Sequence, residues 1–449
     1  MTCETLVPRH LKVVAGVLLL AAMAAHGDEK DPLAGSPRVL GGQVTFIGQR
    51  LGPFSSPYSG KNSLESEGTG GTTSTYGIYL GERLLSSLEA YADVEMARGS
   101  ALSNATGVGG LTNGDELREG SVDLGKGPYV ARLYARYWIP LSSETEQKSR
   151  AQDQLAGTEP ATRIEFKLGK FAATDDFDVN RYANNTRTQF LNWGFINDTA
   201  WDYAADTRGY TRGVMIAYVS PAWALRYGAF QMPTVANGDM FDPALSGARG
   251  DNVELTLKPN PAGTVVRLLT YENHARMGIY RDALAMAHAT GTIPDIAADD
   301  EPGRHKYGFG LNVEQPLADG GDTGVFARLG WNDGKTESFA FTEVDRHFSV
   351  GAQLSGSRWS RSDDRVGLGV LSHLLSADHR NYLAAGGSGF VLGDGRLNYG
   401  HERIVEVYYL TQLRRYVQVT PDFQFIDNPG YNRDRGPAYV LSLRLRLAI

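Results

Sequence analysis

The sequence predicts an all-β protein, a closed antiparallel β-barrel that crosses a membrane with about sixteen strands. Apolar and polar residues alternate strictly in many short segments, and short and long connections alternate between those segments. No segment beyond the N-terminus is apolar enough to span a membrane as a helix. Composition agrees, because 53 glycines and 22 tyrosines in 449 residues are typical of many strands and turns.

The alternation assigns a lipid face and a lumen face to each expected strand. In 88–96 one face is wholly apolar and the other is acidic, and in 129–138 Ala131 falls on the apolar face. The residues expected to face lipid are Leu88, Ala92, Val94, Leu133, Phe166, Leu255, Leu443 and Leu445. The residues expected to form the lumen wall are Glu89, Asp93, Glu95, Arg132, Arg136, Arg163, Glu165 and Lys167.

Sixteen segments have this character, and an even number is what single-chain bacterial barrels require. Their ranges are 43–49, 72–80, 87–96, 129–138, 163–170, 209–218, 222–232, 251–258, 264–273, 305–315, 323–332, 346–355, 365–373, 402–413, 415–425 and 438–449. Tight links such as 219–221 alternate with long ones such as 171–208, as periplasmic turns alternate with extracellular loops. Residues 139–162 break this order, and their polar composition predicts a disordered or helical periplasmic insertion.

The N-terminus has the pattern of a secretory signal peptide. Arg9, His10 and Lys12 precede a short apolar run that ends near small residues. We therefore expect residues 1–27 to be a signal peptide, 28–42 an N-terminal periplasmic segment and 43–449 the barrel. The only cysteine, Cys3, lies in the segment expected to be removed. Export together with a barrel pattern predicts the bacterial outer membrane as the location.

Several functional classes do not fit the sequence. The net charge of -7 and the pI near 5.8 argue against nucleic-acid binding. The sequence holds no set of serine, histidine and acidic residue with the spacing typical of a catalytic nucleophile and its partners. We therefore expect no enzyme activity. The run from Asp176 to Asn180 begins like a calcium loop, but arginines occupy the positions of its glycine and closing glutamate. We expect no cofactor and no metal.

Three stretches resemble the carbohydrate-selective porins of the OprB type. They are FAATDDFDVNRYANNTRTQFLNWGF with WDYAADTRGY in 171–210, GLTNGDELR in 110–118, and the C-terminal PDFQFIDNPGYNRDRGPAYVLSLRLRLAI in 421–449. WALRYGAFQMP in 223–233 is also similar to that family. The resemblance implies a sixteen-stranded outer-membrane porin that passes sugars such as glucose by passive or facilitated diffusion.

The long segment 171–208 is the expected constriction loop. It is rich in carboxylates, arginines and aromatic rings, groups that bind sugar hydroxyls and stack on apolar sugar faces. A loop this long and this aromatic is typical of a functional element rather than a disordered one. The residues expected to contact the permeant are Asp175, Asp176, Asp178, Arg181, Trp193, Trp201, Asp202, Tyr203 and Arg208.

Two other functions share part of this pattern. A general or anion-preferring diffusion porin would line its constriction mostly with arginine and lysine, and a secreted β-rich carbohydrate-binding protein or enzyme would dissolve without detergent. The expected partners of a sugar porin are outer-membrane lipid and lipopolysaccharide, small saccharides, the outer-membrane assembly machinery and two further copies in a homotrimer.

Overall fold

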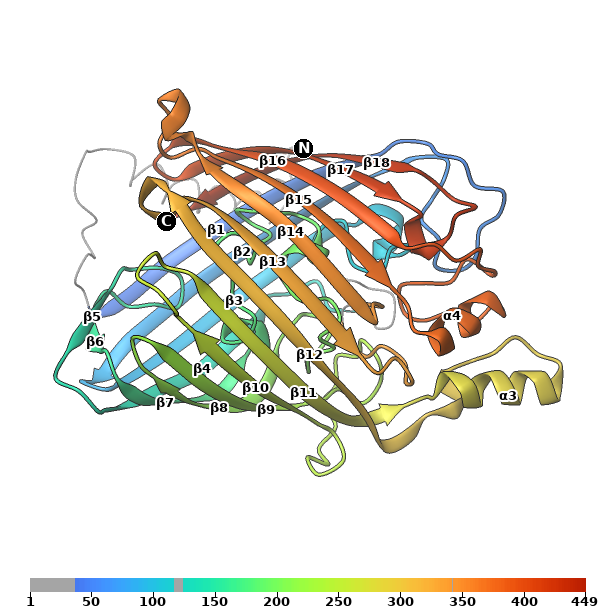
Figure 1. The fold of residues 1–449 in the computed structure, drawn as a ribbon, viewed down its shortest axis with the longest axis horizontal. Coiled ribbons are helices and arrows are strands. Elements are labelled where there is room, and N and C mark those ends of the chain that lie inside the picture. Colours follow the sequence, from blue (N-terminus) through green and yellow to red (C-terminus); the bar gives the residue numbers. More distant parts are fainter. Residues whose placement is uncertain (1–36, 117–123, 341) are drawn as a thin grey trace, which may run out of the picture.

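The computed structural model describes residues 37–116, 124–340 and 342–449, and it shows a closed antiparallel β-barrel (Figure 1). The expected signal peptide 1–27 and the end of the motif in 110–118 lie outside the described residues. The predicted fold class, a barrel of sixteen strands, is confirmed.

Each of the sixteen barrel strands overlaps one of the predicted segments. Their bounds are β1 Arg38–Leu51, β2 Thr69–Leu85, β3 Leu88–Ser100, β4 Tyr129–Pro140, β7 Arg163–Phe171, β8 Thr211–Val219, β9 Trp223–Gln231, β10 Arg249–Leu257, β11 Val265–Met277, β12 Glu301–Ala318, β13 Thr323–Asn332, β14 Arg346–Ser355, β15 Arg365–Leu374, β16 Glu402–Arg414, β17 Val417–Asp427 and β18 Ala438–Ala448. The α-helices are α2 Trp193–Ile196, α3 Tyr280–Thr290 and α4 Ala377–Ala384. Short 3₁₀ turns occur at Leu102–Ala105, Ala173–Asp175, Ala297–Asp299, Asp319–Gly321, Gly356–Trp359 and Pro429–Tyr431.

The first and last strands close the barrel. β1 pairs antiparallel with β18, from Gln43 opposite Ala448 to Leu51 opposite Val440. Every other barrel strand pairs with the strand that precedes it and the strand that follows it, except that β4 pairs directly with β7. Closure leaves no open sheet edge, which a membrane-spanning sheet requires because lipid offers backbone groups no hydrogen-bond partner.

The two ends of the barrel differ. Tight turns and the C-terminus lie at one end, with the small sheet of β5 (Thr145–Lys148) and β6 (Gly157–Pro160), whereas α3 and α4 lie in long loops at the other (Figure 1). In outer-membrane barrels the short turns face the periplasm and the long loops face outward. Among the described residues, no helix has the length and apolarity to cross a membrane.

Along the strands, alternate residues face the outside and the inside of the barrel, as the sequence pattern predicts. Leu133 and Leu443 are 59% and 56% exposed on the outer surface, whereas Glu89 and Asp93 are buried inside. The expected faces hold along most strands. Ala131 is an exception, because a bulge between β3 and β4 at Asp93 shifts the register and turns Ala131 inward. The prediction of Ala131 on the lipid face is therefore wrong, since an inserted residue reverses every side chain beyond it.

Two boundaries also differ from expectation. β1 begins at Arg38, so the last part of the expected periplasmic segment 28–42 belongs to the barrel. The insertion 139–162 is neither disordered nor helical, because β5 and β6 form an antiparallel hairpin within it.

We expect the outward face of β10 to tolerate charge poorly. Leu255 lies at mid-strand opposite Leu225 and Leu268, both exposed on the outer surface. Leu255→Arg should lower the free energy of unfolding by roughly 2–4 kcal/mol, the cost of a cation at the bilayer midplane. Val235→Arg is the control, because Val235 is 46% exposed but lies in a loop. Urea unfolding in lipid vesicles measures both, and equal costs would contradict the assigned lipid face.

Candidate functional site

The loop between β7 and β8 lies inside the barrel. Asp178 accepts hydrogen bonds from Asn312 Nδ2 of β12 at 2.6 Å and from Arg328 Nε of β13 at 3.1 Å. Elsewhere around the barrel, the Asn192 side-chain amide donates to Gln424 of β17. The Trp201 indole N–H donates to Asn252 of β10 at 2.8 Å. Contacts to strands around the barrel hold 172–210 across the lumen.

The barrel wall makes room for this loop with glycine. Gly310 of β12 and Gly330 of β13 are directly opposite each other, and both face the Asp198 carboxylate. A Cβ on Gly330 would lie 1.8 Å from Asp198 Oδ1, and one on Gly310 would lie 2.5 Å from Oδ2. A larger residue at either position would displace the Asp198 carboxylate, so these strand glycines allow the close approach of the loop.

A second segment enters the lumen from the short-turn end. Gln152, in the connection between β5 and β6, donates to Asp93 Oδ2 at 3.3 Å, and the Leu155 backbone N–H donates to the Tyr91 hydroxyl. Glu159 of β6 accepts a hydrogen bond from Arg136 Nη2 at 2.8 Å. The insertion in 139–162 is therefore packed against the inner wall of β3 and β4.

A cavity of about 690 Å³ lies between the loop 172–210, which contains most of the expected constriction segment 171–208, and this insertion. Most of its lining comes from β3, β4 and β7, from the loop 172–210 and from 148–154, with further residues from β2, β6, β18 and 114–116. The volume lies within the range typical of small-molecule sites. The lining combines tyrosine rings, amides and charged groups of both signs, which is a suitable surface for a hydroxylated solute.

Many charged groups of the cavity wall form ion pairs with one another. Arg132 of β4 lies 3.1 Å from Asp93, 3.6 Å from Asp153 and 2.7 Å from Asp175. Arg132 thus joins the wall, the insertion and the constriction loop. Burial raises the pKa of Asp153, and the nearby Arg132 opposes that shift. Buried pairs of this kind fix geometry more than they stabilise a fold.

A neighbouring set of pairs continues the wall. Arg136 Nη1 lies 3.3 Å from Glu89 Oε2, and Arg136 Nε lies 2.8 Å from Glu165 Oε1. Lys167 Nζ lies 2.9 Å from Asp176 Oδ2. Because Arg132, Arg136 and Lys167 already have carboxylate partners, this part of the wall offers polar contacts with little unbalanced charge.

The structure separates the sequence-predicted residues into two groups. Those that line the cavity are Asp175, Asp176, Trp193, Tyr203 and Arg208 of the loop, and Glu95, Arg132, Arg136, Glu165 and Lys167 of the wall. Those that do not line it are Asp178, Arg181, Trp201 and Asp202 of the loop, and Glu89, Asp93 and Arg163 of the wall.

The residues of the second group have other contacts. Trp201 is buried, and Asp202 pairs with Lys306 of β12 at 3.0 Å, so both fasten the loop to the barrel. Arg181 lines a separate opening of about 580 Å³ beside Arg415 at the short-turn end. Arg163 lies behind the cavity, where its Nη2 is 3.2 Å from Glu159 Oε2.

Sequence reasoning missed part of the lining. Arg187 pairs with Glu95 of β3 at 2.9 Å and with Asp115 at 2.7 Å, and the Tyr210 hydroxyl donates to Glu95. Asp153 comes from the insertion. These residues derive from three connections far apart in the chain, so no local pattern links them. In the sequence, the mixed charge of the segments 110–118 and 171–208 is the feature that points to a contribution to the lining.

The ion pairs of Asp175 with Arg132 and Lys167 should make the stability of the fold depend on pH. Burial would raise its pKa, but Arg132 and Lys167 outweigh burial, and the pKa of Asp175 is lowered. Its ionised form therefore stabilises the fold above the usual pKa of an aspartate, and this contribution is lost as the pH falls through the lowered value.

We expect Asp175→Asn to cost roughly 2 kcal/mol of unfolding free energy at pH 7 and clearly less at pH 2, as measured by urea unfolding. Glu82→Gln is the control, because the Arg38–Glu82 pair is largely exposed and should contribute little at either pH. A cost of Asp175→Asn that does not change with pH would contradict the pairing.

Known proteins resemble this chain at both sequence and fold level. Candidate porin QuiX of Acinetobacter baylyi is 22% identical over 304 residues, which cover 63% of this chain. The matched part spans 65% of the length of that relative.

Among solved structures, OprB of Pseudomonas putida at high pH superposes with a TM-score of 0.66 at 17% identity, covering 93% of this chain and 95% of that one. The outer membrane channel DcaP of Acinetobacter baumannii has a TM-score of 0.50 at 7% identity, covering 92% and 97%. At these identities the solved structures show a shared fold. The match to the family model of carbohydrate-selective porins extends over residues 82–448, and the chain therefore belongs to the OprB family.

Proposed function

We propose that this chain forms a water-filled channel of the bacterial outer membrane through which small saccharides such as glucose diffuse passively. The observation that carries the proposal is the cavity of about 690 Å³ inside a closed barrel, bounded by the constriction loop on one side and by the insertion on the other. Family membership supports a channel rather than an enzyme.

The lining suits neutral polyols because its contacts are many and individually weak. Paired arginines and carboxylates exchange hydrogen bonds with hydroxyl groups while they keep their own partners. Trp193, Tyr129 and Tyr210 add aromatic surface to the same cavity. A diffusion channel needs binding that is favourable enough for entry and weak enough for exit, and a series of such contacts meets both needs.

Osmotic swelling of vesicles that contain the purified protein tests this function. We expect swelling in glucose far above that of protein-free vesicles, with slower swelling for trisaccharides because the cavity is narrow. Swelling at the protein-free rate in glucose would contradict the proposal.

The alternative of an anion-preferring porin has less support. The cavity lining holds eight carboxylate residues and seven lysines or arginines, so its formal charge is nearly balanced. We therefore expect a reversal potential close to zero in a potassium chloride gradient. A reversal potential near the chloride equilibrium value would favour the anion-preferring channel.

The proposal also covers export, the contacts with the permeant and assembly in the membrane. Residues 1–27 direct export, Asp175, Asp176, Trp193, Tyr203 and Arg208 contact the permeant, and the barrel works as a homotrimer in lipid and lipopolysaccharide after insertion by the outer-membrane assembly machinery. N-terminal sequencing of the membrane-extracted protein tests the cleavage, and chemical cross-linking in intact outer membranes tests the trimer.

A further inference from the structure

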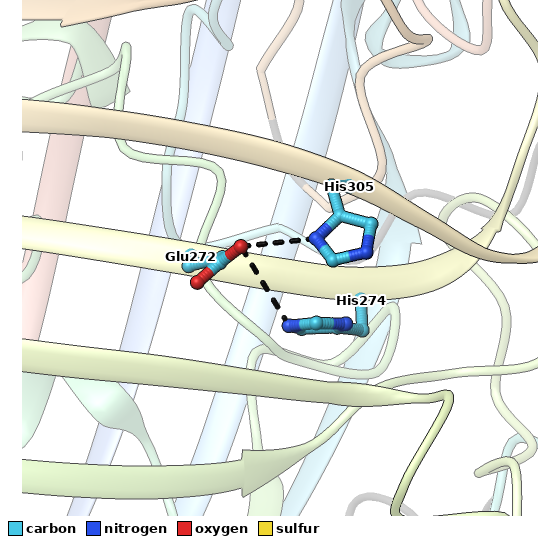
Figure 2. A group of neighbouring side chains, drawn as sticks. All are labelled: Glu272, His274 and His305. Atoms are coloured by element: carbon cyan, nitrogen blue, oxygen red, sulfur yellow. Dashed lines mark hydrogen bonds and ion pairs between the residues drawn. The ribbon is translucent and has the colours of Figure 1, made fainter.

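A carboxylate and two imidazoles meet on the outer surface of the barrel. Glu272 and His274 are outward residues of β11, and His305 is the β12 residue directly opposite His274 (Figure 2). Glu272 Oε1 lies 2.9 Å from His305 Nδ1 and 3.8 Å from His274 Nε2, and the two imidazole centroids are 4.0 Å apart. Strand pairing thus brings together residues that are 31 positions apart in the chain, a spacing without a sequence signature.

The distances fit a tetrahedral metal. At metal–ligand distances of about 2.0–2.2 Å, two ligand atoms of a tetrahedral Zn²⁺ are roughly 3.3 Å apart. The separations of 2.9 and 3.8 Å bracket this value, and one ligand atom from each residue lies within 4.8 Å of the others. Two histidines and a glutamate are also a known ligand set for zinc with one position left for water.

The surroundings leave the three side chains available. Asp251 lies opposite Glu272 on β10, but it is bound by Arg249 at 2.9 Å and by the Tyr227 hydroxyl at 2.6 Å. Within the described ranges 37–116, 124–340 and 342–449, no lysine or arginine forms an ion pair with Glu272. Among the described residues, the two imidazoles are the only ion-pair partners of its negative charge.

The position along the strands places the trio at the membrane interface. Toward the barrel middle, the outward positions next along β11 and β12 are Thr270, opposite Phe309, and then Leu268. The rings of Tyr307, which lies opposite Glu272, and of Phe309 pack against Trp331 of β13 and form a small aromatic cluster beside the trio. Aromatic rings gather at the edges of the apolar band of such barrels, so the trio lies at the edge of that band on the long-loop side.

We infer that Glu272, His274 and His305 form a binding site for a divalent transition metal of the Zn²⁺ type on the outer face of the barrel. The metal links β11 to β12 where both strands extend toward the loop that carries α3. The site is independent of the lumen, since all three residues point away from it.

Titration calorimetry with Zn²⁺ on the untagged full chain in detergent tests the site. We expect one Zn²⁺ per chain with a rise in the thermal midpoint, and no comparable binding of Mg²⁺, which prefers oxygen ligands. His274→Ala and His305→Ala should each weaken Zn²⁺ binding by about tenfold or more, and Glu272→Gln should weaken it less. His288→Ala is the matched control, because His288 is exposed on α3 and belongs to no such cluster among the described residues.

Two results of the Zn²⁺ titration would contradict the site. Wild-type protein whose Zn²⁺ binding equals that of the double variant His274→Ala/His305→Ala contradicts the site, as does an equal loss in His288→Ala. All of these substitutions lie on exposed or outward positions, so the variants should assemble, and the shift of the folded barrel on unheated gels verifies this before titration.

Discussion

Arg328→Ala should release the constriction loop and open the channel. The Arg328 guanidinium is fully buried on β13 and donates to the Asp178 carboxylate, to Phe195 O at 2.7 Å and to Ala183 O at 2.8 Å. One side chain thus fastens three points of the loop. Removing one partner of a buried ion pair costs roughly 3–5 kcal/mol, which is enough to free a loop that does not form part of the sheet.

We expect single-channel conductance to rise and block by glucose to weaken together in Arg328→Ala. Arg328→Lys should have an intermediate effect, because an ammonium group keeps the charge but cannot reach all three acceptors. Arg403→Ala is the control, since the Arg403–Asp427 pair is exposed. Unchanged conductance and unchanged sugar block in an assembled Arg328→Ala barrel would place the constriction elsewhere.

Removal of the hairpin formed by β5 and β6 should have the second large effect. The backbone already pairs at its base, where the Leu141 N–H donates to Thr162 O at 2.9 Å. Residues 144–160 can therefore be replaced by a short Asn-Gly turn without separating β4 from β7. Arg136 keeps Glu89 and Glu165 as partners after the loss of Glu159, so the wall should stay intact.

We expect this deletion to raise conductance and to raise the size limit for sugars in the swelling assay, because it removes one boundary of the cavity. Wild-type conductance and size limit in the deletion variant would show that the hairpin lies outside the conducting path. A matched control exchanges Ser142 for alanine, which changes the base of the hairpin but leaves its lumen contacts in place.

The transmembrane strands are predictable from the sequence because residues that face lipid are apolar and the alternate residues that face the lumen are polar. The expected ranges 323–332 and 346–355 coincide with β13 and β14. The sequence predicts a first strand from residue 43, later than the observed start, and Gly41 and Gly42 also pair with β2. The inversion at Ala131 depends on a bulge, and a bulge leaves no mark in a pattern read from one strand.

The lumen was less predictable because both sides of the constriction loop meet protein or water. Trp201 and Trp193 have the same sequence character, yet Trp201 packs against the wall and Trp193 lines the cavity. Which ring faces the permeant depends on how the loop crosses the barrel. The hairpin in 139–162 lacked a signal for the same reason, since its partners Asp93 and Arg136 belong to other strands.

Sugar block of single channels in a planar bilayer tests the central claim most directly. The protein should form open channels whose current falls as glucose is added, with a saturable dependence on glucose concentration, because the solute occupies the cavity that the ions cross. The variants Asp175→Asn and Arg208→Ala should weaken that block. A current that falls only in proportion to solution viscosity, equally in wild type and in both variants, would contradict a saccharide channel with this cavity as its constriction.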